Sequence, residues 1–144
     1  MKNGRPFKDL KEETTNNKEE AMPHTATHPM SKEMEKCIQD CLACYQACLQ
    51  AVTYCLQMGG KHAAAKHIRL LLDCAEICQT SASFMLRNSD LHGQVCEVCA
   101  EVCERSAENC EQFGEDSQMN ACAEACRRCA VSCNQMARAQ GKAA

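Results

Sequence analysis

The sequence has few aromatic residues and no excess of positive charge. Phe, Trp and Tyr together make up 3% of its 144 residues, and 16 basic against 19 acidic side chains give a formal net charge of -3. Proteins that neutralise nucleic-acid phosphates present a basic surface, which this balance does not supply. We therefore expect no nucleic-acid partner. The shortage of large apolar side chains also predicts a thin core for the single domain that this length allows.

The sequence also lacks long apolar stretches, and no proline occurs after residue 29. No run approaches the roughly 20 consecutive apolar residues of a membrane span, and residues 1–30 lack the apolar segment of a secretory signal. We expect a cytoplasmic protein without a membrane partner. The three prolines are Pro6, Pro23 and Pro29, in a polar stretch without apolar periodicity. The sequence thus predicts a disordered tail over 1–30 and a folded domain over 31–144.

Strong helix formers separated by short breaks follow the last proline. The breaks contain glycine or turn-forming polar residues, as helix ends commonly do. We expect helices over about 31–58, 61–87, 91–113 and 117–140, with Asp116 or Ser117 as the N-cap of the last one. Four helices with short connections predict an all-α, antiparallel up-down-up-down four-helix bundle.

Cysteine is abundant, and its positions follow one face of each expected helix. Successive cysteines are separated by three, four or seven residues within the first, third and fourth helices. Steps of this size place side chains on one helix face, so the pattern predicts a bundle with a cysteine-lined interior. The 15 cysteines are Cys37, Cys41, Cys44, Cys48, Cys55, Cys74, Cys78, Cys96, Cys99, Cys103, Cys110, Cys122, Cys126, Cys129 and Cys133.

Such a row of thiols is typical of soft metal ligands. In a reducing cytosol, clustered cysteines bind metals more often than they form disulfides, and thiolates favour Cu(I), zinc and iron-sulfur clusters. Iron-sulfur proteins use other spacings, and structural zinc usually takes two separated pairs. A Cu(I) ion accepts only two or three thiolates, so a single Cys-x-x-x-Cys pair on one helix can hold one such ion. Six such pairs occur here, which favours storage of many Cu(I) ions over a one-ion chaperone.

Three other interpretations stay open. Cysteine can serve as a small hydrophobic core residue. A zinc or heavy-metal buffer would use the same ligands. A thiol redox or disulfide-exchange protein would use the Cys-x-x-Cys pairs Cys41/Cys44, Cys96/Cys99 and Cys126/Cys129, although no strand pattern accompanies them. We expect a protein that is not an enzyme.

The cysteine-rich stretches resemble the bacterial copper storage proteins over about residues 34–137. The most specific stretches are residues 73–78, 96–103 and 122–133. The resemblance implies a cytosolic homotetramer of four-helix bundles that binds multiple Cu(I) ions. A copper chaperone or a recipient cuproenzyme would be its partner.

Several positions depart from an unbroken cysteine pattern. Ala51 and Ser106 stand where the resemblance places cysteine in relatives, which predicts fewer sites or a break in the row. His67 lies one heptad before Cys74 and is a candidate copper ligand. Antiparallel helices would bring His67 to the same end as Met58, His62 and Met119, weaker Cu(I) ligands suited to exchange. We expect copper to enter at this end.

A second stripe of the first helix runs one position behind its cysteines. Its apolar side chains can seal the helix against a neighbouring helix or subunit. The stripe consists of Ile38, Leu42, Tyr45, Leu49, Val52 and Leu56.

Overall fold

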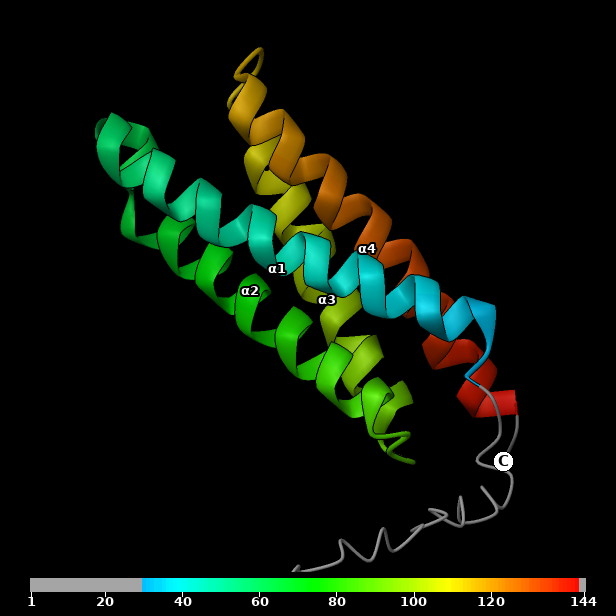
Figure 1. The fold of residues 1–144 in the computed structure, drawn as a ribbon. Coiled ribbons are helices and arrows are strands. Elements are labelled where there is room, and N and C mark those ends of the chain that lie inside the picture. The colour runs from blue at the N-terminus through cyan, green and yellow to red at the C-terminus, as the bar shows by residue number, and fades with distance from the viewer. Residues whose placement is uncertain (1–29, 143–144) are drawn as a thin grey trace, which may run out of the picture.

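The computed structural model describes residues 30–142, so nearly all of the tail predicted over 1–30 lies outside the described residues. Four helices form a bundle in which consecutive helices run antiparallel, and no strand occurs within the described range (Figure 1). The predicted fold is confirmed. The elements are α1 (Lys32–Met58), the 3₁₀ turn η1 (Gly60–Ala63), α2 (Ala65–Leu86), α3 (His92–Glu111) and α4 (Ser117–Lys142).

Local side-chain and backbone chemistry explains where the helices begin and end. The Ser31 hydroxyl accepts a hydrogen bond from the Met34 amide at 3.1 Å and caps α1. Gly59 and Gly60 end that helix with φ angles of 70° and 56°, which side chains with a Cβ rarely adopt. Asp116 caps α4 by accepting from the amides of Gln118 and Met119 at 3.0 and 3.1 Å.

The second helix begins later than the sequence predicts. Residues expected to start it form η1 instead, and Ala64 has a ψ angle of 133°, which is not helical. Helical propensity over 61–64 therefore gives way to a turn that brings the chain back from α1. The third helix ends at Glu111, two residues before the predicted boundary.

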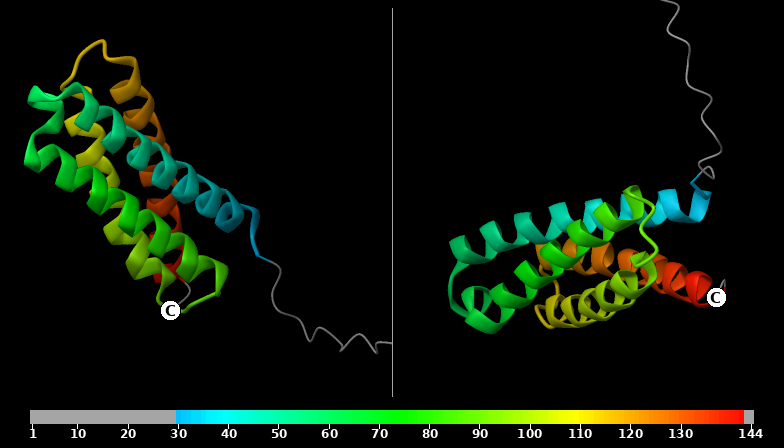
Figure 2. Two further views of the ribbon diagram at one scale, coloured as in Figure 1. Left: turned by 60° about the vertical axis from the view of Figure 1, so that its left-hand side comes forward. Right: turned by 90° about the horizontal axis from the view of Figure 1, so that it is seen from below.

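Each helix packs against two neighbours around a common axis. Helix α1 contacts α2 and α4, and α3 also contacts α2 and α4. Two further views show this four-cornered arrangement, with the loops between α1 and α2 and between α3 and α4 at the same end (Figure 2). None of the described helices is long and apolar enough to cross a bilayer.

The core is built almost entirely from small side chains. Cysteine and alanine supply most of it, and the largest fully buried side chains are Leu71, Met85 and Met119. The apolar stripe of α1 is covered only in part: Ile38 is buried, whereas Leu42, Leu49 and Leu56 are 39%, 37% and 59% exposed. Within one chain this stripe does not seal α1 against its neighbours.

Candidate metal centre

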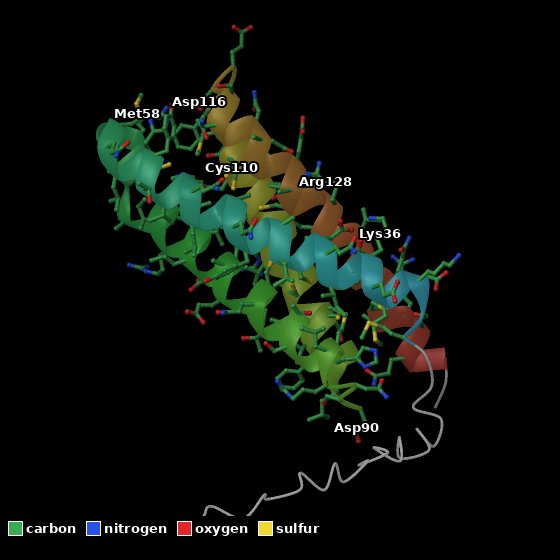
Figure 3. The ribbon with its side chains drawn as sticks, in the orientation of Figure 1. Lys36, Met58, Asp90, Cys110, Asp116 and Arg128 are labelled. Carbon is green, nitrogen blue, oxygen red and sulfur yellow. The ribbon has the colours of Figure 1, made fainter. Side chains whose placement is uncertain are left out.

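All fifteen cysteines point into the bundle and are free thiols. Each is at most 2% exposed, and every helix contributes at least two of them. Their sulfurs lie between the ribbons, while charged side chains such as Lys36 and Arg128 extend outward (Figure 3). The heptad spacing thus placed every thiol correctly on the interior face.

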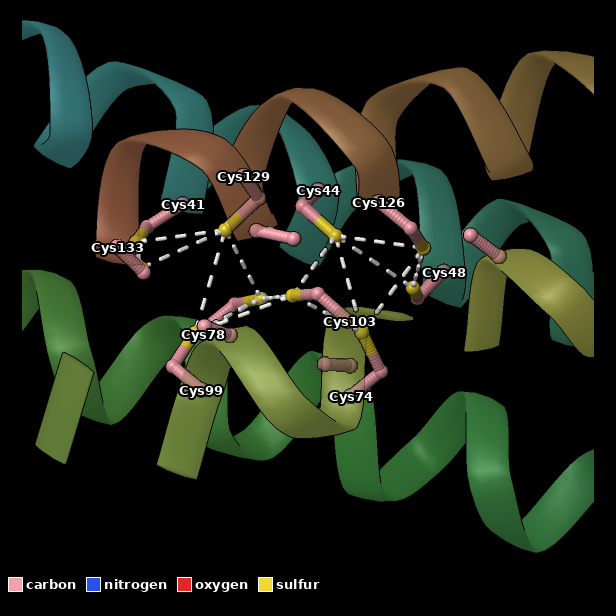
Figure 4. Close-up of a cluster of buried hydrophobic side chains, with 14 of the residues drawn as sticks. Cys41, Cys44, Cys48, Cys74, Cys78, Cys99, Cys103, Cys126, Cys129 and Cys133 are labelled. Atoms are coloured by element: carbon pink, nitrogen blue, oxygen red, sulfur yellow. Dashed lines mark hydrogen bonds between the residues drawn. The ribbon is translucent and has the colours of Figure 1, made fainter. Parts of the chain in front are cut away.

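The sulfurs form five overlapping groups along the bundle axis. Within each group all sulfurs lie within 4.8 Å of one another. Separations between helices are short, for example 3.5 Å from Cys41 to Cys133 and 3.5 Å from Cys78 to Cys103 (Figure 4). The groups are Cys37/Cys96/Cys133, Cys41/Cys99/Cys129/Cys133, Cys78/Cys99/Cys103/Cys129, Cys44/Cys74/Cys78/Cys103 and Cys44/Cys48/Cys74/Cys126.

Shared cysteines join these groups into one continuous row, which we call the thiol row. Cys133 belongs to the first two groups, Cys99 to the second and third, Cys78 to the third and fourth, and Cys44 to the last two. Beyond the last group, Cys122 lies 3.9 Å from Cys48. A thiolate common to two groups can bridge two metal ions, so the row can hold a chain of linked sites.

Hydrogen bonds between thiols shift their acidity. Cys129 donates to Cys41 across 3.6 Å, and this bond is the main reason that the pKa of Cys41 is lowered to about 6. A thiol that donates keeps its proton, while its acceptor gains thiolate character. Thiolate charge in a dry interior is costly without a cation. The row therefore suits a cation with affinity for sulfur.

The end that carries the α1–α2 and α3–α4 loops holds three different donor types. His67 Nε2 lies 3.3 Å from Cys55 Sγ, and Met119 Sδ lies 3.7 Å from the same sulfur. His67 and Met119 are 4% and 0% exposed. The structure therefore brings these two predicted residues to a thiol. No hydrogen bond joins a thiol to Met58 or His62 within residues 30–142, and Met58 is 54% exposed.

His62 belongs to a hydrogen-bonded network centred on Asp116. Asp116 Oδ2 is 2.8 Å from His62 Nε2 and accepts the Tyr54 hydroxyl at 2.9 Å. The hydrogen bond with His62 and that from the Met119 amide lower the pKa of Asp116 to about 2. One carboxylate thus ties α1, η1 and the start of α4 together at this end of the bundle.

Replacing Asp116 by alanine should destabilise the metal-free protein at neutral pH. We expect the midpoint of thermal unfolding to fall by about 5 °C, because the α4 cap and the links to Tyr54 and His62 are lost. The folded pKa of Asp116 lies below its ordinary value of 3.8. Its stabilisation is therefore present above that value and is lost as the pH falls towards 2.

Far-UV circular dichroism melts at several pH values measure this effect. The difference in unfolding midpoint between Asp116→Ala and the unmodified protein should become smaller as the pH falls below about 4, because Asp116 then begins to be protonated in the unfolded chain. Glu115→Ala, which changes an exposed neighbour, should leave the midpoint unchanged. A pH-independent gap would contradict the role of the Asp116 charge.

At the opposite end, Cys96 contacts two side chains that are not cysteines. Its sulfur lies 3.3 Å from Ser81 Oγ and 3.9 Å from Met85 Sδ. Gln140 crosses from α4, accepts the Gly93 amide and donates to the Asp90 carbonyl. A Cβ at Gly93 would collide with Gln140. Glycine is required there for α3 and α4 to meet so closely.

Two polar residues beside the thiols were not predicted from the sequence. Ser81 continues the heptad positions of Cys74 and Cys78, so its place on the stripe was a usable signal. Asn109 contacts His67 Nδ1 through its Oδ1 atom, and nothing in the spacing indicates this pairing. Ala51 and Ser106, where the cysteine pattern is interrupted, lie on the interior face and are 3% and 0% exposed.

The chain is similar to known proteins in sequence and in fold. The model of a family described as copper storage protein matches residues 30–138. A structure from Nitrosospira multiformis is 45% identical, with a TM-score of 0.71 and coverage of 74% of this chain and 96% of its own. The Cu(I)-bound copper storage protein 3 of Bacillus subtilis is 34% identical, with a TM-score of 0.68 and coverage of 74% and 99%. A cytosolic copper storage protein from Streptomyces lividans, with five coppers, is 32% identical, with a TM-score of 0.67 and coverage of 74% and 92%.

Proposed function

Because this chain belongs to the copper storage protein family, we propose that it stores copper by binding many Cu(I) ions in its thiol row. The observation that carries this function is the set of five linked sulfur groups. The relatives from Bacillus and Streptomyces support it, since their structures hold Cu(I) or several coppers. The family's description is one of storage, not of catalysis.

Charge explains how the row can hold so many ions. A Cu(I) ion bound by two unshared thiolates leaves a net negative charge in the interior, which is costly. When each thiolate bridges two ions, the row is neutral once ions and thiolates are equal in number. The overlapping groups provide such bridges, so fifteen thiols would hold on the order of a dozen Cu(I) ions.

An anaerobic titration with Cu(I) tests this function. The fully reduced chain is mixed with Cu(I) against a competing chelator, and bound metal is counted after gel filtration. We expect retention of about ten or more ions per chain. Retention of one to three ions would favour a chaperone or sensor instead.

The four-thiol groups also favour a second candidate, a zinc or heavy-metal buffer. Zinc prefers four ligands that it does not have to share. At most two of the four-thiol groups have no cysteine in common, for example Cys41/Cys99/Cys129/Cys133 with Cys44/Cys48/Cys74/Cys126. A zinc buffer would thus saturate at about two ions and resist Cu(I), whereas a copper store should lose its zinc to Cu(I). Burial of every thiol argues against disulfide exchange, which needs an accessible sulfur.

Copper access and cellular setting follow from the same proposal. We propose that copper enters at the end where His67 and Met119 contact Cys55. Met58 and Asp116 lie at this end (Figure 3), and His62 contacts Asp116. The Streptomyces relative is cytosolic, and we propose the cytoplasm for this chain too. A copper chaperone would deliver the ion, or a cuproenzyme would receive it.

We also propose that the chain forms a homotetramer in which other subunits cover the outer face of α1. Leu42, Leu49 and Leu56 lie on that face and are 39%, 37% and 59% exposed in the single chain. Apolar side chains repeated along one helix face are typical of contact with another helix.

Replacing Leu42 and Leu49 by glutamate should dissociate this tetramer. Two buried charges without partners would oppose assembly strongly, so we expect the mass measured by light scattering to fall from that of four chains to that of one. Val131→Glu, on α4 and 59% exposed, is the matched control and should keep the tetramer. An unchanged mass for the Leu42→Glu/Leu49→Glu variant would place the interface elsewhere.

A further inference from the structure

Four sulfurs of the thiol row form a nearly regular tetrahedron. They come from α2, α3 and α4, and we call the set Cys78/Cys99/Cys103/Cys129 the central group (Figure 4). Cys78 Sγ lies 3.7 Å from the sulfurs of both Cys99 and Cys129, and 3.5 Å from the third. Cys99 Sγ lies 3.9 Å from Cys103 Sγ and 4.0 Å from Cys129 Sγ. Five of the six edges of this tetrahedron therefore measure between 3.5 and 4.0 Å.

This spacing matches the size of a zinc site with four thiolate ligands. Zn²⁺ binds four cysteine sulfurs in tetrahedral geometry at about 2.3 Å, which places neighbouring sulfurs about 3.8 Å apart. The sulfurs of the central group therefore need little movement to surround one Zn²⁺. Cys99 and Cys103 lie one helical turn apart on α3 and provide the closely spaced pair of ligands that structural zinc sites commonly contain.

One other four-thiol group competes with the central group. The set Cys44/Cys48/Cys74/Cys126, which we call the neighbouring group, has sulfur separations of 3.6 to 4.0 Å and shares no cysteine with it. The remaining two four-thiol groups share cysteines with the central group. Cys74 Sγ of the neighbouring group lies 3.7 Å from Cys103 Sγ of the central group. Two zinc ions, each with four thiolates and a net negative charge, would thus adjoin in a dry interior, which is costly. We expect only one of the two groups to hold zinc tightly.

The surrounding thiols favour the central group. A thiol that stays protonated can donate a hydrogen bond to a zinc-bound sulfur and so offset its negative charge. The sulfurs of Cys41 and Cys133 lie 3.6 and 3.9 Å from one sulfur of the central group. Those of Cys44 and Cys74 lie 4.0 and 3.7 Å from another. The central group therefore has four such partners, whereas the neighbouring group has two among the thiols of residues 30–142.

Resting on the copper storage function, we propose that the central group holds one Zn²⁺ when copper is scarce and releases it as Cu(I) is loaded. On zinc binding the four thiols release their protons to solvent, and the ion with its four thiolates has a net charge of -2. Four Cu(I) ions balance the same four thiolates completely, so the exchange frees one Zn²⁺ and leaves no net charge. No electron is transferred. Thiolates also prefer the softer Cu(I) ion, so the zinc form is a resting state that copper displaces.

Competition with a zinc chelator tests the proposal in the full-length, reduced chain. We expect about one Zn²⁺ per chain to remain after gel filtration in the presence of the chelator, fewer than the two at which a zinc buffer would saturate. Co²⁺ in place of zinc should show the strong visible absorption of a tetrahedral thiolate complex. Anaerobic addition of Cu(I) should transfer the zinc to a coloured chelator, and the transfer should be complete before the row is full.

Paired cysteine-to-serine variants locate the ion. Cys78→Ser/Cys129→Ser removes two ligands of the central group and should weaken zinc binding at least about 100-fold. Cys55→Ser/Cys110→Ser removes two buried thiols that belong to none of the five groups, and it should keep the affinity within about twofold. Circular dichroism checks that both variants are folded. Equal zinc affinities in the two variants would reject the central group as the site.

The variant Cys48→Ser/Cys126→Ser distinguishes the central group from the neighbouring group. It should retain its zinc, and loss of zinc in this variant but not in Cys78→Ser/Cys129→Ser would overturn the assignment. If many Cu(I) ions bind while no zinc withstands the chelator, the zinc site is wrong and storage stands. If zinc stays bound in an excess of Cu(I), the storage function itself fails.

Discussion

Loading with Cu(I) should raise the midpoint of thermal unfolding by more than about 15 °C. The metal-free core contains few large side chains, with Leu71, Met85 and Met119 as the largest that are fully buried. Each copper shared between helices adds a link that the unfolded chain forms less well. A ligand that binds the folded chain more tightly than the unfolded chain stabilises the fold, and the contributions of many sites add up.

Anaerobic far-UV circular dichroism melts of reduced protein, with and without copper, measure this shift. The metal-free chain should already be helical, because helix propensity and the caps at Ser31 and Asp116 do not depend on metal. A strong Cu(I) chelator should return the midpoint to its metal-free value. A metal-free chain with little helix would contradict the expectation that the bundle folds without metal. An unfolding midpoint that copper does not change would contradict the expected stabilisation.

Replacing Cys44 and Cys103 together by serine should remove at least about four bound ions. Three of the five groups contain one or both of these residues. Cys44 Sγ lies 3.6 Å from Cys126 Sγ and 3.7 Å from Cys74 Sγ, and Cys103 Sγ lies 3.5 Å from Cys78 Sγ. Each substitution therefore removes a bridging thiolate and leaves neighbouring ions with too few ligands.

The matched control is the double variant Cys55→Ser/Cys110→Ser. Both of its cysteines are 0% exposed but belong to none of the five groups. It should lose no more than about two ions, since no bridge between groups is broken. Bound copper is counted after gel filtration, with circular dichroism to confirm folding. Equal losses in the two variants would show that the thiols act independently rather than as a linked row.

Much of this architecture could be predicted because cysteine carries two signals at once. Its spacing of three and four residues defines the inward face of α1, α3 and α4, and its chemistry indicates a soft metal. Gly59 and Asn88 marked turns correctly, and both have positive φ angles. Asp116 was one of two residues expected to cap α4, and its carboxylate does so.

The features that could not be predicted depend on contacts between distant segments. Asn109 meets His67 from another helix, and Tyr54 meets Asp116 across 62 positions of sequence. Single-sequence periodicity reports which face a residue occupies but not which residue it faces. The turn at Gly60–Ala63 was missed for a similar reason, since alanine and lysine favour helix and the reversal towards α2 overrides that preference.

The overlap between sulfur groups has a consequence for how copper travels inside the protein. Because each pair of adjoining groups shares at least one cysteine, namely Cys133, Cys99, Cys78 or Cys44 in turn, an ion can form a bond to the next sulfur before it releases the last one. Movement along the axis then proceeds by short ligand exchanges and never requires a free ion. Copper taken up at one end can thus spread to the other end. The order in which ions enter therefore does not fix the sites that they finally occupy. The bundle would then transfer Cu(I) along its axis as well as store it.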